Sequence, residues 1–169
     1  MTPSSQDASK LRDHAPLVQL GDGVAISQIG GVCMALWRKK PTASTFEMQR
    51  AYLDSAVKKL SGRVVFMCVV EGGTEPPEDD IRKASSTMIT SHGEALKAVA
   101  IVVEGSGFKA AISRTVISGI GLLVRTPSPI KYFESAASAA AWLTQFVPIG
   151  NIGRFVEQVE HVRGSLPKR

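Results

Sequence analysis

The chain has 169 residues, of which 44% are hydrophobic and 21% charged, and its formal net charge at pH 7 is +5. This composition is that of an ordinary globular protein and excludes a disordered or collagen-like chain. No apolar run approaches the ~20 residues that a membrane-spanning helix needs, and the first residues lack the pattern of a signal peptide, so we expect a cytoplasmic protein without a membrane partner.

The charges are unevenly distributed along the chain. Residues 37–63 contain seven basic and two acidic residues, whereas residues 71–80 contain five acidic residues and no basic one. The two blocks are expected to meet either in a partner or in each other. Few aromatic residues accompany the basic block and no reader motif is recognised, so we interpret it as a solvated helix face and expect no nucleic-acid partner.

The first part of the chain predicts a tail and an antiparallel hairpin. Residues 1–16 are polar, contain two prolines and show no hydrophobic period, which indicates a flexible tail. The apolar runs VAISQIG and VCMALW then follow on either side of Gly30 and Gly31, and the run LVQL precedes them. Paired glycines permit the positive φ values of a tight turn, so we expect a hairpin with a short strand before it.

Two helices and two buried strands are expected next. Ser44 and Glu47 have the spacing of a capping box, which predicts a helix of about 17 residues that ends near Gly62. The valine-rich run over 63–70 is typical of a strand covered on both faces. A second helix is expected to begin around Glu78, where acidic residues suit the positive end of the helix dipole, and residues 97–104 are the next buried strand.

The second half of the chain continues the alternation of strands and helices. An apolar helix is expected from Phe108 to about residue 124, then a short strand over 130–134, and then an alanine-rich helix that Ser135 caps and Pro148 ends. Residues 151–163 form a further amphipathic helix, which Asn151 caps. Its apolar stripe must be buried on its own sheet or on a second copy, and we predict a homo-oligomer through Ile152 to Val162.

The cysteines and histidines of the sequence form no pattern typical of a catalytic or metal-binding site. Cys33 and Cys68 lie inside apolar strands and are interpreted as buried, reduced thiols. The three histidines, His14, His92 and His161, are scattered and no nucleophile motif accompanies them. We therefore expect no enzyme, no cofactor and no metal site, although a divalent metal at the acidic block is an alternative to its structural role.

The order of the elements, a hairpin followed by alternating helices and strands, predicts a small mixed, mostly parallel sheet with helices packed on it. At this point the chain resembles the STAS domain family, and most of all its SpoIIAA-like branch. The resemblance is carried by VAISQIGGVCMALW, by RVVFMCVVEG and by KAVAIVVEGSGFKAAISRTVIS leading through IKYFESAASAAAWL. It covers residues 17–147, so residues 148–169 are expected to add a C-terminal helix and tail outside the domain.

The resemblance implies a non-enzymatic protein-binding module of bacterial signalling. Family members are switched off by phosphorylation of a Ser in an Asp-Ser-Ser/Thr-Gly loop before the second helix, and the matching loop here offers only Thr74, beside several acidic residues. Thr74 is therefore a poor candidate for this modification. The partner surface that the resemblance implies comprises Thr74, Glu75, Glu78, Asp79, Arg82, Ser85 and Ser86.

Two alternatives to a protein-binding module remain. Gly105, Ser106 and Gly107 begin a G-x-G-x-x-A spacing after a strand, and Glu134 ends the next strand, as a nucleotide site requires. Glu104 opposes this hypothesis because its charge would repel a phosphate, and too few residues follow for a second nucleotide-binding half. The apolar strands and the expected helix over 108–124 also fit a carrier of small ligands or lipids.

Overall fold

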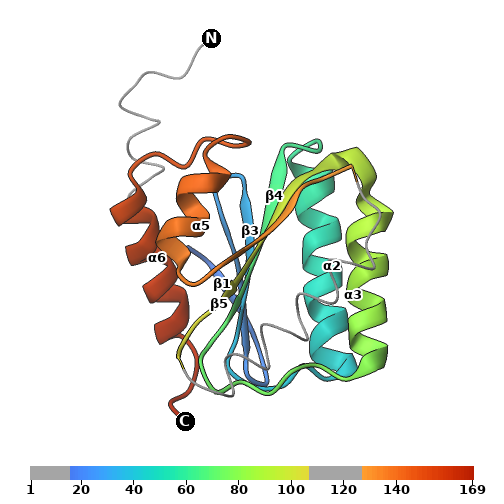
Figure 1. Cartoon of the computed structure of the whole chain (residues 1–169), viewed down its shortest axis with the longest axis vertical. Helices are drawn as coiled ribbons and strands as arrows, with labels where there is room; N and C mark the ends of the chain where they lie inside the picture. The colour runs from blue at the N-terminus through green and yellow to red at the C-terminus, as the bar shows by residue number, and fades with distance from the viewer. Residues whose placement is uncertain (1–15, 107–126) are drawn as a thin grey trace.

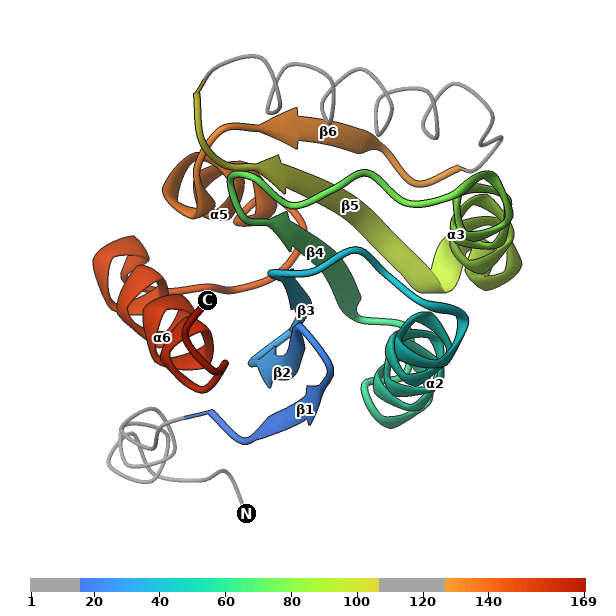
Figure 2. The same cartoon turned by 90° about the horizontal axis from the view of Figure 1, so that it is seen from below.

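The computed structural model describes residues 16–106 and 127–169, and these form a three-layer α/β structure (Figure 1). Within the described residues, two helices lie on each face of a six-stranded mixed sheet, which is seen almost edge-on in Figure 2. The strands are β1 (Val18–Gly21), β2 (Val24–Ile29), β3 (Val32–Trp37), β4 (Val64–Val70), β5 (Leu96–Val103) and β6 (Ile130–Phe133). The helices are α2 (Ala43–Lys59), α3 (Asp79–His92), α5 (Ala136–Leu143) and α6 (Ile152–Gly164), with a short 3-10 turn, η1 (Gly93–Ala95).

The N-terminal strands form the expected antiparallel unit. β1 pairs with β2, and β2 pairs with β3 around a two-residue turn in which Ile29 faces Val32. Gly30 in this turn has a φ of 58°, a conformation that glycine adopts without steric cost. The hairpin and the short strand before it are therefore confirmed. The predicted tail over 1–16 lies almost wholly outside the described residues.

The remaining strands are parallel and follow one another across the sheet in chain order. β3 pairs with β4, β4 with β5 and β5 with β6. Each connection advances one position in the same direction, so right-handed crossovers place α2 and α3 on one face. α5 and α6 come after β6 and cover the opposite face (Figure 2). The predicted helix over 108–124 lies outside the described residues.

β4 and β5 explain why the buried strands contain nearly continuous apolar runs. Alternate side chains of a strand point to opposite faces, and here both faces are covered by helices. Val64 and Phe66 pack in the core beneath α2 and α3, whereas Val65 and Met67 pack in the core beneath α5 and α6. In β4 and β5 only the side chain of Lys97, at the start of β5, is exposed.

The start of α2 differs from the prediction. The helix has the expected 17 residues, but it begins at Ala43 and its capping box joins Thr42 to Thr45 rather than Ser44 to Glu47. The hydroxyl of Thr42 accepts from the Thr45 amide at 3.2 Å, and the Thr45 hydroxyl accepts from the Thr42 amide at 2.9 Å. Both spacings are present in the sequence, and the earlier one prevails because Thr42, directly after Pro41, has extended backbone angles.

The alanine-rich helix is shorter than expected. Ser135 caps α5 as predicted, by accepting from the Ser138 amide, but the helix ends at Leu143, well before Pro148. The amides of Gln145 and Phe146 instead donate to carbonyls three residues earlier, which tightens the chain into turns. Trp142 packs between the rings of two phenylalanines at this end of the sheet, Phe133 and Phe146.

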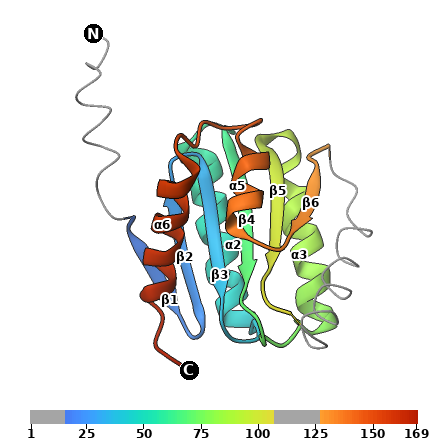
Figure 3. The same ribbon diagram turned by 60° about the vertical axis from the view of Figure 1, so that its left-hand side comes forward.

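The C-terminal helix α6 packs on the chain's own sheet (Figure 3). Phe155, Val159 and Val162 are at most 2% exposed and belong to the same core as Met34 and α5. Of the two places open to this apolar stripe, the sheet of the same chain is the one it occupies. The homo-oligomer was predicted because this stripe needed a surface to cover it, and that need is met within the chain. The homo-oligomer stays a prediction.

Candidate functional site

Charged residues gather where the parallel strands end. Arg38 follows β3, Glu71 follows β4 and Glu104 follows β5, and the carboxyl ends of parallel strands meet at one edge of a sheet. This edge is where open α/β sheets commonly bind ligands. The structure instead fills much of it with an ion-pair network of Arg38, Glu71, Glu104 and Arg163, which we call the carboxyl-edge network.

The carboxyl-edge network is made of short, paired contacts. Arg38 donates from Nε and Nη2 to the two oxygens of Glu71 at 2.7 and 2.8 Å. Arg163 donates from Nη1 to Glu71 at 2.9 Å and contacts both oxygens of Glu104, at 2.9 and 2.7 Å. Burial of the Glu71 carboxylate would raise its pKa, but the hydrogen bonds from Arg38 and Arg163 outweigh burial and lower the pKa below its ordinary value.

The two blocks of opposite charge meet within the chain. Arg38 of the basic block pairs with Glu71, and Lys40 pairs with Glu78. The basic and acidic blocks were expected to meet either in a partner or in each other, and these two ion pairs join the blocks to each other. Arg163 is a site residue that was not foreseen from the sequence, where a cation in the last turn of a helix suggests only an interaction with the helix dipole.

The C-terminal segment lies against the same edge of the sheet. Arg38 Nη1 donates to the carbonyl oxygens of Leu166 and Pro167 at 3.1 and 2.8 Å, and the Leu166 side chain is buried. Arg169 Nη2 lies 3.5 Å from Thr74 Oγ1 and 3.7 Å from a Glu71 oxygen. The loop after β4 and the last residues of the chain therefore share contacts.

Thr74, the residue singled out for phosphorylation, is buried. Its side chain is 4% exposed, and its hydroxyl lies 3.3 Å from the carbonyl oxygens of Trp37 and Arg38. A kinase would reach this hydroxyl only after the loop had opened. The modification itself stays a prediction.

The other residues of the predicted partner surface lie in the loop before α3 and along the first turns of this helix. Glu75, Glu78 and Asp79 are exposed, and Arg82 pairs with Asp79 one turn along the helix. Ser85 and Ser86 are half-buried, and each hydroxyl donates to the carbonyl four residues earlier. We call these six residues, Glu75, Glu78, Asp79, Arg82, Ser85 and Ser86, the acidic α3 surface.

The glycine turn after β5 has a structural role in the described part of the chain. Gly105 has a φ of 94°, and a Cβ on it would lie 3.0 Å from the Cα atom of Gly72. The loops that leave β4 and β5 thus approach each other so closely that a side chain at Gly105 would collide with backbone. Ser106 and Glu134 are exposed, and Gly107 lies outside the described residues. Glu104, which was expected to repel a phosphate, is bound by Arg163. The nucleotide hypothesis stays a prediction.

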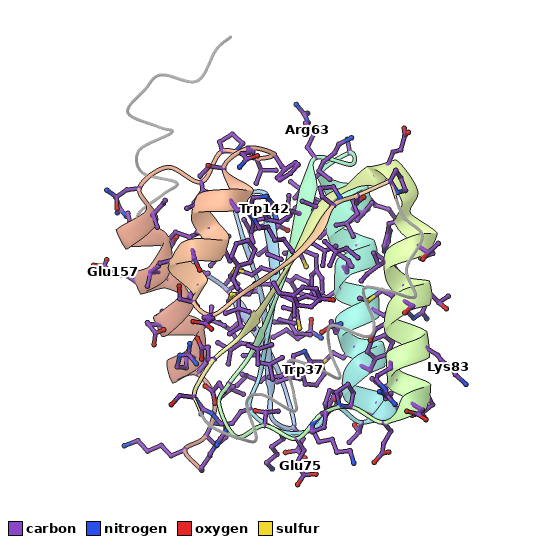
Figure 4. All side chains as sticks on the ribbon, viewed as in Figure 1. Trp37, Arg63, Glu75, Lys83, Trp142 and Glu157 are labelled. Atoms are coloured by element: carbon purple, nitrogen blue, oxygen red, sulfur yellow. The ribbon has the colours of Figure 1, made fainter. Side chains whose placement is uncertain are left out.

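An apolar cavity of about 80 Å³ lies between the sheet and the helices α2 and α3. Its walls include Phe46, Phe66, Ile81, Met88 and Ile101, and its rim includes residues that follow β3 and β4. Figure 4 shows Trp37, which lines the cavity, between the sheet and α2, toward the end of the molecule where Glu75 lies. No feature of the sequence marked this cavity, because its apolar wall residues fit ordinary core positions.

The two thiols lie on this side of the sheet. Cys33 is buried, and Cys68 is half-buried and lines the cavity. Both are free, as expected, and burial raises the pKa of each thiol to about 12. Neither thiol is therefore activated as a nucleophile at neutral pH.

Metal ligands and membrane spans are absent from what the structure describes. Residues 16–106 and 127–169 contain no group of three or more His, Cys, Asp or Glu side chains that could hold a metal ion. No helix within these ranges is both long and apolar enough to cross a membrane. His92 lies 2.9 Å from Asp54, and His161 is exposed.

Comparisons of the chain with protein-family models, curated proteins and solved structures give no match.

Proposed function

We propose that this chain is a non-enzymatic regulatory module of the STAS type, closest to the SpoIIAA-like branch, and that it binds a protein partner through the acidic α3 surface. The order of elements supports the family: an antiparallel hairpin precedes parallel strands that are joined by helices. The partner is expected to present basic residues, because Glu75, Glu78 and Asp79 are exposed together with Asp80.

One observation carries the choice of binding over catalysis. At the carboxyl edge, where an α/β enzyme commonly holds its reacting groups, Arg38, Glu71 and Arg163 are joined in ion pairs. A carboxylate held by two guanidinium groups is a weak proton acceptor, since its pKa is lowered. By contrast, Glu75, Glu78 and Asp79 of the acidic α3 surface are exposed, and α3, which Asp79 begins, packs on the sheet.

A charge-reversal pull-down tests the proposal. The tagged full chain, the double variant Glu75→Lys/Asp79→Lys and the control Glu94→Lys/Glu157→Lys are used to capture proteins from native extract. All four side chains are exposed, so the two variants change the net charge equally. We expect at least one protein to be retained by the unmodified chain and the control but lost from the double variant. Identical sets of proteins on all three baits would contradict the proposed surface.

A further inference from the structure

The cavity beneath α2 and α3 has the character of a binding site for a small molecule. Its volume of about 80 Å³ exceeds the ~10–15 Å³ that a single water needs. Water gains little in such a place, because nearly all of the wall is apolar. An apolar cavity with one or two inward polar groups is the usual form of a site for a small organic molecule.

Gln49 provides such a polar group. Its side chain is 4% exposed and lines the cavity. The indole N–H of Trp37 donates to Gln49 Oε1 at 2.9 Å, and because an indole nitrogen only donates, this contact fixes which end of the amide is oxygen. The amide nitrogen, Nε2, therefore points away from the indole, and its recorded acceptor is the sulfur of Met88 at 3.7 Å.

The amide nitrogen of Gln49 retains hydrogen-bonding capacity. It carries two N–H groups, a thioether is a weak acceptor for one of them, and within residues 16–106 and 127–169 no further acceptor is recorded for the other. A buried donor without a partner costs free energy, and a ligand with an acceptor would remove that cost. The amide nitrogen of Gln49 therefore favours a ligand that carries a hydrogen-bond acceptor.

The rim of the cavity restricts the charge of a ligand. Glu75 is exposed at the rim, and among residues 16–106 and 127–169 no Lys or Arg lines the cavity. We propose that the cavity binds a small neutral molecule, about the size of one ring, whose carbonyl, ether or ring nitrogen accepts the free N–H of Gln49. This site is independent of the proposed protein partner, because it requires only the purified chain and a small molecule.

Nuclear magnetic resonance with two matched probes tests the site. Cyclohexanone and methylenecyclohexane have nearly the same shape, and only the ketone is a good hydrogen-bond acceptor. We expect both probes to shift the Met88 methyl and Trp37 indole signals of the full chain in a saturable manner, and to leave the Met34 methyl on the opposite face unchanged. Cyclohexanone should bind about fivefold more tightly than methylenecyclohexane, which is the change in Kd expected from one net hydrogen bond.

Variants test whether the probes bind inside the cavity rather than on the surface, and whether Gln49 causes the preference for the ketone. Ser85→Leu places a larger side chain in the cavity and should abolish both sets of shifts, as should Cys68→Met from the sheet side. Thr87→Leu, at an exposed position two residues along α3 that is not among the lining residues, should bind as the unmodified chain does. Gln49→Leu should remove the fivefold preference. The proposal is overturned if neither probe shifts Met88, if folded Ser85→Leu and Cys68→Met still bind, or if Gln49→Leu keeps the preference.

Discussion

Arg163, in the last turn of α6, donates hydrogen bonds to both carboxylate oxygens of Glu104, the residue that follows β5. The N···O distances are 2.9 and 2.7 Å. This pair is bidentate, the strongest arrangement of an arginine and a carboxylate. The same guanidinium also contacts Glu71 after β4. The C-terminal helix is thereby fixed to two strand ends, in addition to the apolar stripe that packs on the sheet.

Replacement of Arg163 with Met should destabilise the fold. It leaves two carboxylates, Glu71 and Glu104, close together and partly buried without their shared cation, and we expect a loss of about 2–4 kcal/mol in the free energy of unfolding. Arg50→Met is the matched control, since Arg50 is exposed and pairs with the exposed Glu47 and the half-buried Asp54 on α2, and it should cost less than ~1 kcal/mol. Urea unfolding followed by circular dichroism measures both, and equal losses would contradict the role of the network.

Stability should fall in acid, in part through Glu71. The pKa of this carboxyl is lowered in the folded chain from an ordinary value of 4.5, so the unfolded chain binds more protons in acid. The contribution is fully present above pH 4.5 and is lost as the pH falls through the lower, folded-state pKa. Unfolding midpoints between neutral pH and pH 3 should decline more steeply for the unmodified chain than for Glu71→Gln. Parallel curves would show that Glu71 does not contribute.

Gly105→Ala should be more harmful than a comparable change at Gly30. Both glycines have positive φ values, of 94° and 58°, so alanine is strained at either position. A Cβ at Gly105 would also lie 3.0 Å from the Gly72 backbone, whereas nothing lies within 4 Å of one at Gly30. We expect a loss of about 1–3 kcal/mol at Gly30 and a larger loss at Gly105, from thermal unfolding. A smaller loss at Gly105 would refute the close approach of the two loops.

The two thiols should react slowly in the folded chain. Burial raises the pKa of each to about 12, so at pH 8 the thiolate fraction is about three orders of magnitude below that of an exposed cysteine. Reaction with a chromogenic disulfide should therefore be slow until urea is added, with Cys68 modified before the more deeply buried Cys33. Rapid labelling of Cys33 in the native chain would contradict this.

Hydrophobic spacing was sufficient to predict most of the elements. The stripe of Phe155, Val159 and Val162 repeats every three to four residues, and the helix it predicted is present as α6. Where the stripe packs could not be predicted, because an apolar face is satisfied equally well by its own sheet or by another chain. The start of α2 was misplaced for a local reason, namely that two overlapping capping spacings compete there.

The candidate sites were harder to predict than the fold. Arg163 meets Glu71 and Glu104 across 92 and 59 residues, and no pattern in the sequence encodes a pairing at such a distance. Gln49 is polar and lies on a helix, so spacing alone suggests an exposed position, yet it is buried beside Trp37. Thr74 was chosen for its place in the loop, and its burial depends on where Trp37 and Arg38 end β3.

Photo-crosslinking in the cell that produces the chain tests the central claim, that this is a protein-binding module that uses the start of α3. A photoreactive amino acid is placed at Lys83, beside the acidic α3 surface, or at Glu157 on α6, both of which are exposed and labelled in Figure 4. We expect a crosslinked product of defined mass from position 83 that is absent from position 157 and is lost in the Glu75→Lys/Asp79→Lys background. No product at position 83, or the same product from both positions, would contradict the claim.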